Sequence, residues 1–181
     1  MRKACFALIV CILATPAYAD GSAIHSSVGI GVDAGYRTAD SISVIDWGIA
    51  ASYSLGGEVW EDISLYGKAG FLFDAPVKTF EPFLSFKPAY GLLLAFGAMF
   101  HVDPWLFEAE AGLVLSWMNS YPIVEFMAGG AVKYRFASMS ETMLRVPISF
   151  SVLIPLRIRF SGNSFGATAG IGISVEIGTY A

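Results

Sequence analysis

The chain contains few residues of the kinds that form cross-links or carry out catalysis. Its two cysteines, Cys5 and Cys11, lie near the start, and its two histidines are His25 and His101. Disulfides therefore cannot stabilise the rest of the chain. Two isolated histidines make neither a metal site nor a catalytic triad. We predict no metal, no cofactor, no catalytic residue and no enzymatic activity.

Long apolar runs are also scarce, and the clearest one is at the start. Arg2 and Lys3 precede an apolar run over 4–14, and Pro16-Ala17-Tyr18-Ala19 supplies an Ala-x-Ala site. This pattern predicts a cleaved secretory signal peptide over 1–19 and a mature domain over 20–181. The alternative is a lipoprotein signal with Cys11 as the lipid-accepting residue, to which the preceding Val10 is poorly suited.

Beyond that segment the chain is apolar but has no candidate membrane helix. Hydrophobic residues make up 55% of the sequence, yet no later apolar run reaches the roughly 18 residues that a spanning helix needs. Because only helices and closed barrels satisfy every backbone group in lipid, this composition predicts a β-barrel. Without Arg2 and Lys3 the chain has 9 basic and 15 acidic residues, a net charge of −6, so we predict no nucleic-acid partner.

Strict alternation is the main secondary-structure signal. Over 165–180, one parity carries apolar residues and the other carries glycine with small or charged residues. That is the period of a strand with lipid on one side and a narrow lumen on the other. Similar patterns, separated by turn residues such as Leu55-Gly56-Gly57, predict an all-β, eight-stranded antiparallel up-and-down transmembrane β-barrel. The expected strands are 26–37, 43–54, 58–73, 83–102, 105–118, 123–136, 142–160 and 165–180, with Asp74 starting a loop and Pro155 bending the seventh.

Charge is confined to the inward parity. The outward parity carries no charged residue except Glu61 at a strand margin. Acids and bases nearly balance on the inward side, which predicts a lumen closed by ion pairs and hydrogen bonds. Arg157 and Arg159 share this parity, and Met99, Met118 and Met127 are expected to pack in the lumen. The predicted lumen network comprises Asp33, Arg37, Asp46, Lys68, Glu108, Glu110, Glu125, Lys133, Arg135, Arg145 and Glu176.

Aromatic residues gather toward both ends of the expected strands, as in the interfacial belts of membrane proteins. A soluble β-sandwich is the alternative. A lipocalin-like barrel fits less well because it needs large apolar residues inside and charge outside. The predicted aromatic girdle comprises Tyr36, Trp47, Tyr53, Phe73, Phe100, Phe107, Trp117, Tyr134, Phe136, Phe165 and Tyr180.

The signal peptide, the eight alternating strands and the two belts together resemble the small outer-membrane barrels of bacteria, the OmpX, OmpW and OmpA-barrel families. The resemblance implies outer-membrane lipid and the barrel-assembly machinery as partners. An even strand number predicts that both termini are periplasmic. Such barrels commonly end in an aromatic residue in phase with the outward row. Tyr180 is one residue out of phase with Ile177, which a bulge near Gly178 would correct.

Three functional hypotheses follow. The first is a structural or surface-interaction barrel with a plugged lumen and an unidentified surface ligand. The second is a narrow channel for small or apolar solutes, as the resemblance to the OmpW family implies. The third, an enzyme acting on envelope lipid, lacks the required residues, since His25 and His101 look like rim residues. The residues of segment 29–34 match the sequence pattern of a dinucleotide-binding fingerprint. That fingerprint needs a helix to begin at this point, whereas here the alternation typical of a strand continues.

Overall fold

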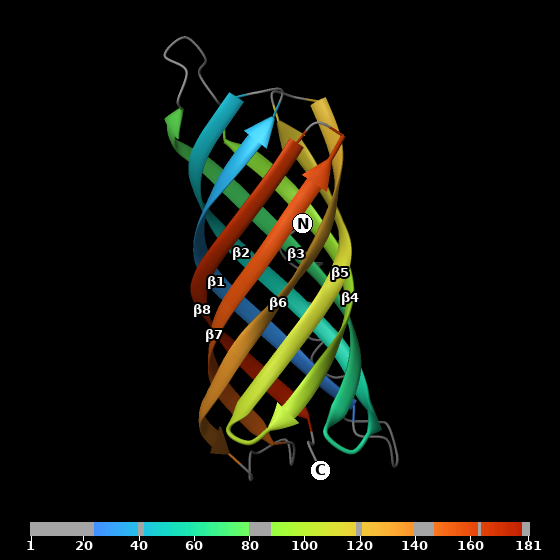
Figure 1. The fold of residues 1–181 in the computed structure, drawn as a ribbon. Helices are drawn as coiled ribbons and strands as arrows, with labels where there is room; N and C mark the ends of the chain where they lie inside the picture. Colours follow the sequence, from blue (N-terminus) through green and yellow to red (C-terminus); the bar gives the residue numbers. More distant parts are fainter. Residues whose placement is uncertain are drawn as a thin grey trace, which may run out of the picture.

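The computed structural model describes residues 24–39, 42–79, 88–118, 121–139, 147–162 and 164–178. These residues form eight antiparallel strands, in which each strand pairs with the next and β8 pairs with β1, so the sheet closes into a barrel (Figure 1). Among the described residues, no helix is long and apolar enough to cross a bilayer. The strands are β1 (Ile24–Ala39), β2 (Ile42–Trp60), β3 (Ile63–Thr79), β4 (Ala89–Val102), β5 (Trp105–Met118), β6 (Tyr121–Met139), β7 (Ile148–Ser161) and β8 (Ser164–Gly178).

The predicted all-β, eight-stranded up-and-down barrel is confirmed. Every strand has at least 14 residues, more than the roughly 9 to 11 that a tilted strand needs to cross a bilayer. The β7–β8 hairpin lies at the upper end of the barrel in Figure 1, and the β2–β3 and β4–β5 hairpins lie at the lower end. These two ends are called upper and lower below.

The alternation in the sequence becomes an alternation of burial. In β4, Leu93 is 1% exposed while its neighbours Leu92 and Leu94 are 48% and 64% exposed. The exposed residues of all eight strands form a continuous apolar outer surface, and Phe96, at 79% exposure, is its most exposed large residue. This surface needs an apolar solvent, which lipid supplies.

The predicted turn between the second and third strands is wrong. We expected it at Leu55-Gly56-Gly57, but β2 continues through these residues to Trp60, and the chain turns at Glu61 and Asp62. Gly56 is instead required by packing, because a Cβ there would lie 2.7 Å from Tyr66 Cβ and 2.9 Å from His25 Nε2. Asp62 adopts a positive φ of 64°, which aspartate tolerates in tight turns.

Other strand boundaries differ as well. β3 continues to Thr79, so Asp74 lies inside a strand and not in a loop. β6 continues to Met139, with a register shift between Arg135 and Ala137. The first residues of the expected fourth and seventh strands, 83–87 and 142–146, and the signal peptide over 1–19 lie outside the described residues.

Pro155 coincides with an irregularity in the wall. The β7–β8 register passes from Leu153–Gly172 to Leu156–Ala169, without ladder pairs for Ile154 and Pro155. Proline has no N–H to donate to a ladder, so the cross-strand hydrogen bonding is locally reduced there.

A charge placed on the outer surface tests whether that surface faces lipid. Phe96→Arg should lower the free energy of unfolding by about 2–4 kcal/mol, because an arginine near the middle of a bilayer must be desolvated. The measurement is reversible denaturant unfolding in lipid vesicles, with Glu61→Arg at the exposed β2–β3 turn as the control. Equal stability of Phe96→Arg and the control would contradict a lipid-facing assignment for β4.

Candidate functional site: the lumen

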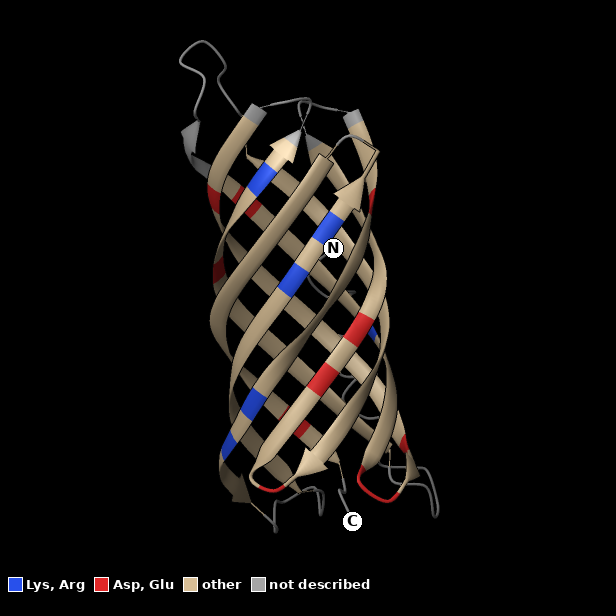
Figure 2. Ribbon diagram, in the orientation of Figure 1, with Lys and Arg blue, Asp and Glu red and all other residues tan. Residues whose placement is uncertain are grey.

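Charged residues occur at several levels along the strands of the barrel wall (Figure 2), and most of their described side chains are buried in the lumen. Seven carboxylates and five cations there have side chains no more than 10% exposed, and each of these carboxylates lies within 4 Å of a cation. Burying an ion without a partner would cost several kcal/mol. The ion pairs therefore offset much of the desolvation cost of placing these charges in the lumen. Two clusters can be distinguished, an upper one and a lower one.

The upper cluster consists of Arg37, Asp46, Asp74, Glu125 and Arg159. Asp74 accepts hydrogen bonds from Arg37 Nη2 at 2.6 Å and from Arg159 Nη1 at 2.7 Å. Arg37 also lies 3.3 Å from Asp46, and Arg159 lies 3.9 Å from Glu125. Because β3 and β7 are four strands apart in a closed ring of eight, the Asp74–Arg159 pair crosses the lumen.

The lower cluster consists of Lys68, Glu108, Glu110, Lys133 and Glu176. Lys133 Nζ lies 2.7 Å from Glu108 Oε1 and 2.8 Å from Glu176 Oε1. Lys68 Nζ lies 3.1 Å from Glu108 Oε2 and also contacts Glu110. All five side chains are less than 10% exposed. Glu108 therefore joins two lysines that come from different strands.

Hydroxyl groups satisfy further carboxylate oxygens in both clusters. Tyr66 donates to Glu110 at 3.3 Å, Ser149 donates to Glu176 at 3.3 Å, and Ser116 donates to Glu125 at 2.7 Å. Hydrogen bonds to charged acceptors are stronger than those between neutral groups. The clusters are therefore held by directional bonds as well as by charge.

Arg157 links the lower cluster to Asp33. Its Nη1 donates to Asp33 Oδ2 at 3.1 Å, and its Nε lies 3.9 Å from Glu110 Oε1. Asp33 lies on β1 and Glu110 on β5, which are opposite strands of the ring. A single guanidinium from β7 thus spans the lumen and joins its two walls.

The remaining predicted lumen residues have different surroundings. Arg135 is near the lower rim, where it pairs at 3.2 Å with Asp103, whose side chain is 80% exposed. Arg145 lies outside the described residues. Asp74 was missed because its position after the expected third strand suggested a loop. β3 extends past the expected end because it still pairs with β2 and β4 at Asp74. In this longer strand the Asp74 side chain points into the lumen.

The lumen also contains an apolar part that the sequence did not reveal. Six inward residues from β2 to β6 pack together, and Tyr66, Met99 and Leu106 form a second group. The sequence signal for this apolar part was the run Leu92-Leu93-Leu94, because a strand with only one apolar face would alternate between apolar and polar residues. The expected packing of Met99 and Met127 agrees with their exposures of 0% and 2%, while the Met118 side chain lies outside the described part. The first group comprises Ala50, Leu72, Leu93, Ala95, Val114 and Met127.

The two histidines meet near the lower end of the lumen. Their ring centroids are 6.4 Å apart with the rings at 77°, and His101 Nε2 lies 3.1 Å from Ser64 Oγ. His25 is 1% exposed. Sequence spacing could not reveal this meeting, because β1 and β4 are not neighbours. In the described part of the chain, no group of three or more potential ligands is arranged to hold a metal ion.

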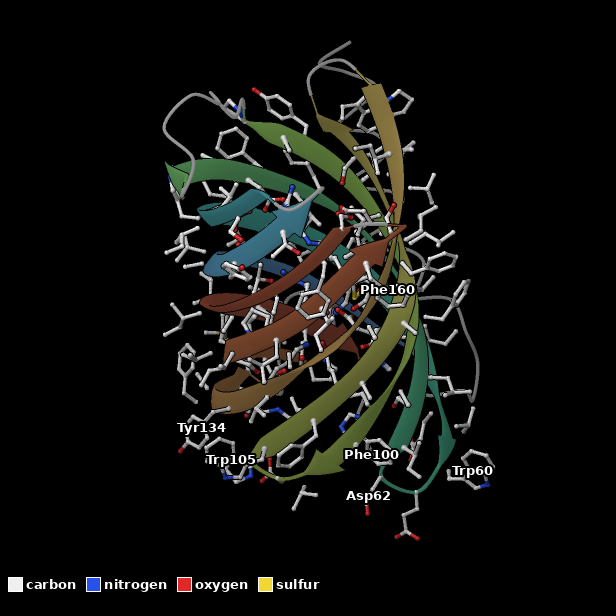
Figure 3. All side chains as sticks on the ribbon, turned by 45° about the horizontal axis from the view of Figure 1, so that its top comes forward. Trp60, Asp62, Phe100, Trp105, Tyr134 and Phe160 are labelled. Carbon is white, nitrogen blue, oxygen red and sulfur yellow. The ribbon has the colours of Figure 1, made fainter. Side chains whose placement is uncertain are left out.

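Aromatic side chains surround the lower end of the outer surface. Figure 3 shows Trp60, Phe100, Trp105 and Tyr134 near that end, with Phe160 well separated from them. The rings of Trp105 and Tyr134 lie 4.9 Å apart. Tyr180 lies outside the described residues, and the other predicted girdle residues are exposed or half-buried on β1 to β6 and β8: Tyr36, Trp47, Tyr53, Phe73, Phe100, Phe107, Trp117, Tyr134, Phe136 and Phe165.

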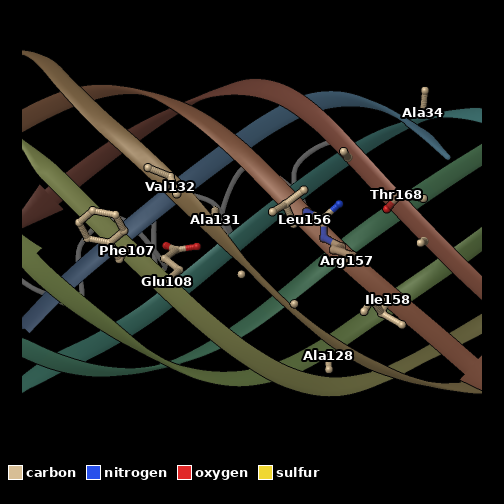
Figure 4. Close-up of a pocket in the computed structure, with 14 residues that line it drawn as sticks. Ala34, Phe107, Glu108, Ala128, Ala131, Val132, Leu156, Arg157, Ile158 and Thr168 are labelled. Carbon is tan, nitrogen blue, oxygen red and sulfur yellow. The ribbon is translucent and has the colours of Figure 1, made fainter.

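A groove on the outer surface crosses β5 to β8 and β1 (Figure 4). Small residues such as Ala34 and Ala128 lie between larger ones such as Phe107, Leu156 and Ile158. These side chains belong to the outward parity, so the groove is part of the apolar outer surface and not of the lumen. Glu108, Arg157 and Thr168, which belong to the inward parity, also line it.

Removing one member of the lower cluster should be far more harmful than removing a rim charge. Lys133→Ala leaves Glu108 and Glu176 short of a cation in a buried site, which should cost about 3–5 kcal/mol of unfolding free energy. Arg135→Ala, two residues along the same strand, should cost less than about 1 kcal/mol because its partner is exposed. Both values come from denaturant unfolding in vesicles. Similar losses for the two variants would argue against a buried, coupled lower cluster.

The comparisons with known proteins agree with this architecture. No protein-family model and no curated protein matches the chain. Among solved structures, Neisserial surface protein A is similar with a TM-score of 0.56 and 13% identity, over 83% of this chain and 96% of that one. Ail, the attachment invasion locus protein of Yersinia pestis, solved with the heparin analogue sucrose octasulfate, is similar with a TM-score of 0.51 and 13% identity, over 85% and 99%. The chain therefore has the fold of the small eight-stranded outer-membrane β-barrels.

Proposed function

We propose that this chain is an integral protein of the bacterial outer membrane, inserted after removal of residues 1–19. The apolar outer surface supports this location, and so does the likeness to the two solved surface barrels. The termini would be periplasmic, at the lower end. An even number of antiparallel strands brings the start of the first strand and the end of the last one to the same end of the barrel.

The lumen is closed to ions and solutes in this proposal. The observation that carries it is the set of ion pairs that join opposite walls, Asp74–Arg159 and Asp33–Arg157–Glu110. An entering solute would have to separate buried pairs, which is costly in a low-dielectric interior. An eight-stranded barrel is also narrow enough for side chains to fill it.

The role of the protein then lies in its outer end, as a structural or surface-interaction barrel. Ail was solved with a sulfated sugar bound, which is consistent with ligand binding as a function of barrels of this size. We propose the same class of role here, with an unidentified ligand. Outer-membrane lipid and the barrel-assembly machinery are the partners that this location requires.

We propose no enzymatic activity for the chain. An enzyme acting on envelope lipid would need its nucleophile and base where lipid can reach them. His25 is buried, and His101 is directed to Ser64 within the barrel wall. Neither histidine is on the outer apolar surface.

Ion conductance separates a closed lumen from a narrow channel. In planar bilayers the refolded protein should show no steady discrete openings, because each described lumen carboxylate is paired. Arg157→Ala should produce openings, since it removes the cation that joins β1 to β5. Steady openings of the unaltered protein would remove the closed-lumen proposal in favour of a channel.

Surface labelling tests the proposed orientation. With residues 1–19 removed the chain has no cysteine, so single cysteines can be introduced freely. A membrane-impermeant maleimide should label Ser161→Cys at the upper end in intact cells and should label Glu61→Cys at the lower end only after lysis. The reverse pattern would overturn the assignment of the lower end to the periplasm.

A further inference from the structure

The lumen has two unlike halves. The inward residues of β3 to β6 include most of the large apolar ones, such as Leu72, Leu93 and Leu106. The inward residues of β7, β8, β1 and β2 include many serines and glycines between the charges. Because the apolar side chains pack against each other, the first half is filled. Space is left along the second half.

Two narrow internal cavities lie along that second half, each about 20 Å³. Both are lined by Gly29, Ser52, Leu153, Pro155 and Arg157, so they are neighbours along the lumen. A cavity of this size holds about one water molecule. A hydrated ion, which carries several waters, is too large for it.

The two cavities extend in opposite directions. One reaches Lys68, Glu108 and Lys133 of the lower cluster, and the other reaches Asp33 next to the upper cluster. Polar groups therefore line this path at both ends. Water can hydrogen-bond to these groups without separating the ion pairs.

Two buried hydroxyls point to water as the occupant. Ser151 and Ser174 are direct cross-strand partners on β7 and β8, and they are 0% and 2% exposed. Their Oγ atoms have no hydrogen-bond partner among the described residues, and Ser174 lines the lower cavity. A buried hydroxyl without a partner is unfavourable, because it has lost the hydrogen bonds that it would make in water. Buried water usually satisfies groups of this kind.

We propose that the wall formed by β7, β8, β1 and β2 binds a file of water, and that the barrel passes water molecules while its ion pairs stop ions. The water would hydrogen-bond to Ser174, Asp33 and the carboxylates of the lower cluster. Arg157 stands beside the file and keeps it one molecule wide. The proposal rests on the closed lumen proposed above and names water as the one species that crosses it.

Gly29 offers a precise way to block this path. A Cβ at Gly29 would lie 3.5 Å from Ser52 Oγ, 3.6 Å from Leu153 Cδ2 and 3.8 Å from Ile173 O, all ordinary contacts. Gly29→Ala therefore adds a methyl group to the shared cavity lining without a clash. Gly67→Ala is the matched control, because a Cβ there would lie 3.7 Å from Phe96 Cε1, a side chain on the outer surface.

The experiment is stopped-flow osmotic shrinkage of vesicles that contain the refolded protein. The unaltered protein and Gly67→Ala should shrink vesicles faster than protein-free vesicles do, and Gly29→Ala should lose most of this protein-dependent rate. Ser174→Val, which replaces the hydroxyl with apolar bulk, should lose it too, and it provides the test if Gly29→Ala does not fold. Folding is checked by the heat-dependent shift of the barrel in electrophoresis.

Two results would overturn the proposal. One is shrinkage with the unaltered protein at the protein-free rate, and the other is an equal rate for Gly29→Ala and Gly67→Ala. Ion flux is recorded on the same vesicles. If neither water nor ions cross, the water path fails while the closed lumen stands. If ions cross with the water, the closed lumen fails as well.

Discussion

The structure depends on one constraint: an ionised side chain in the wall of a membrane barrel has to point inward and find a partner there. Lipid offers no hydrogen bonds, and an unpaired ion on the outer surface is costly. Among the described strand residues, the charged side chains near the middle of the wall are buried in the lumen and paired there. The period-two alternation of the sequence is its direct consequence, because each strand has one side in lipid and one in the lumen.

Once charges are confined to so narrow a space, their arrangement follows from packing. Arginine serves where a pair must cross the lumen, as in Arg159–Asp74, or where one side chain must reach carboxylates on two opposite strands, as Arg157 reaches Asp33 and Glu110, since its long side chain and several donors suit that reach. Lysine serves where one ammonium joins two carboxylates, as Lys133 joins Glu108 and Glu176. The apolar half of the lumen fills the remaining cross-section, so ionic pairing and close packing close the barrel together.

The sequence predicts the fold because parity is a local property that does not depend on which strands pair. The lumen side of Glu110 or Lys133 could be predicted for that reason. Partners such as Arg159 and Asp74 could not, because their meeting requires the register of β3 with its neighbours and the closure of the ring. The turn expected at Leu55–Gly57 was wrong because glycine occurs both in turns and where two segments pack closely. At Gly56 the absence of a side chain makes room for Tyr66. The sequence of β4 does not show on its own which face points into the lumen, because both faces are apolar near Leu93.

That ambiguity makes β4 the most direct place to test the central claim. Spin labels placed one at a time from Leu92 to Phe96 in lipid vesicles would report collisions with dissolved oxygen, which concentrates in acyl chains. The account predicts high oxygen accessibility at Leu92, Leu94 and Phe96 and low accessibility at Leu93 and Ala95. Uniform accessibility along these five positions would contradict a wall with lipid on one side and a packed lumen on the other.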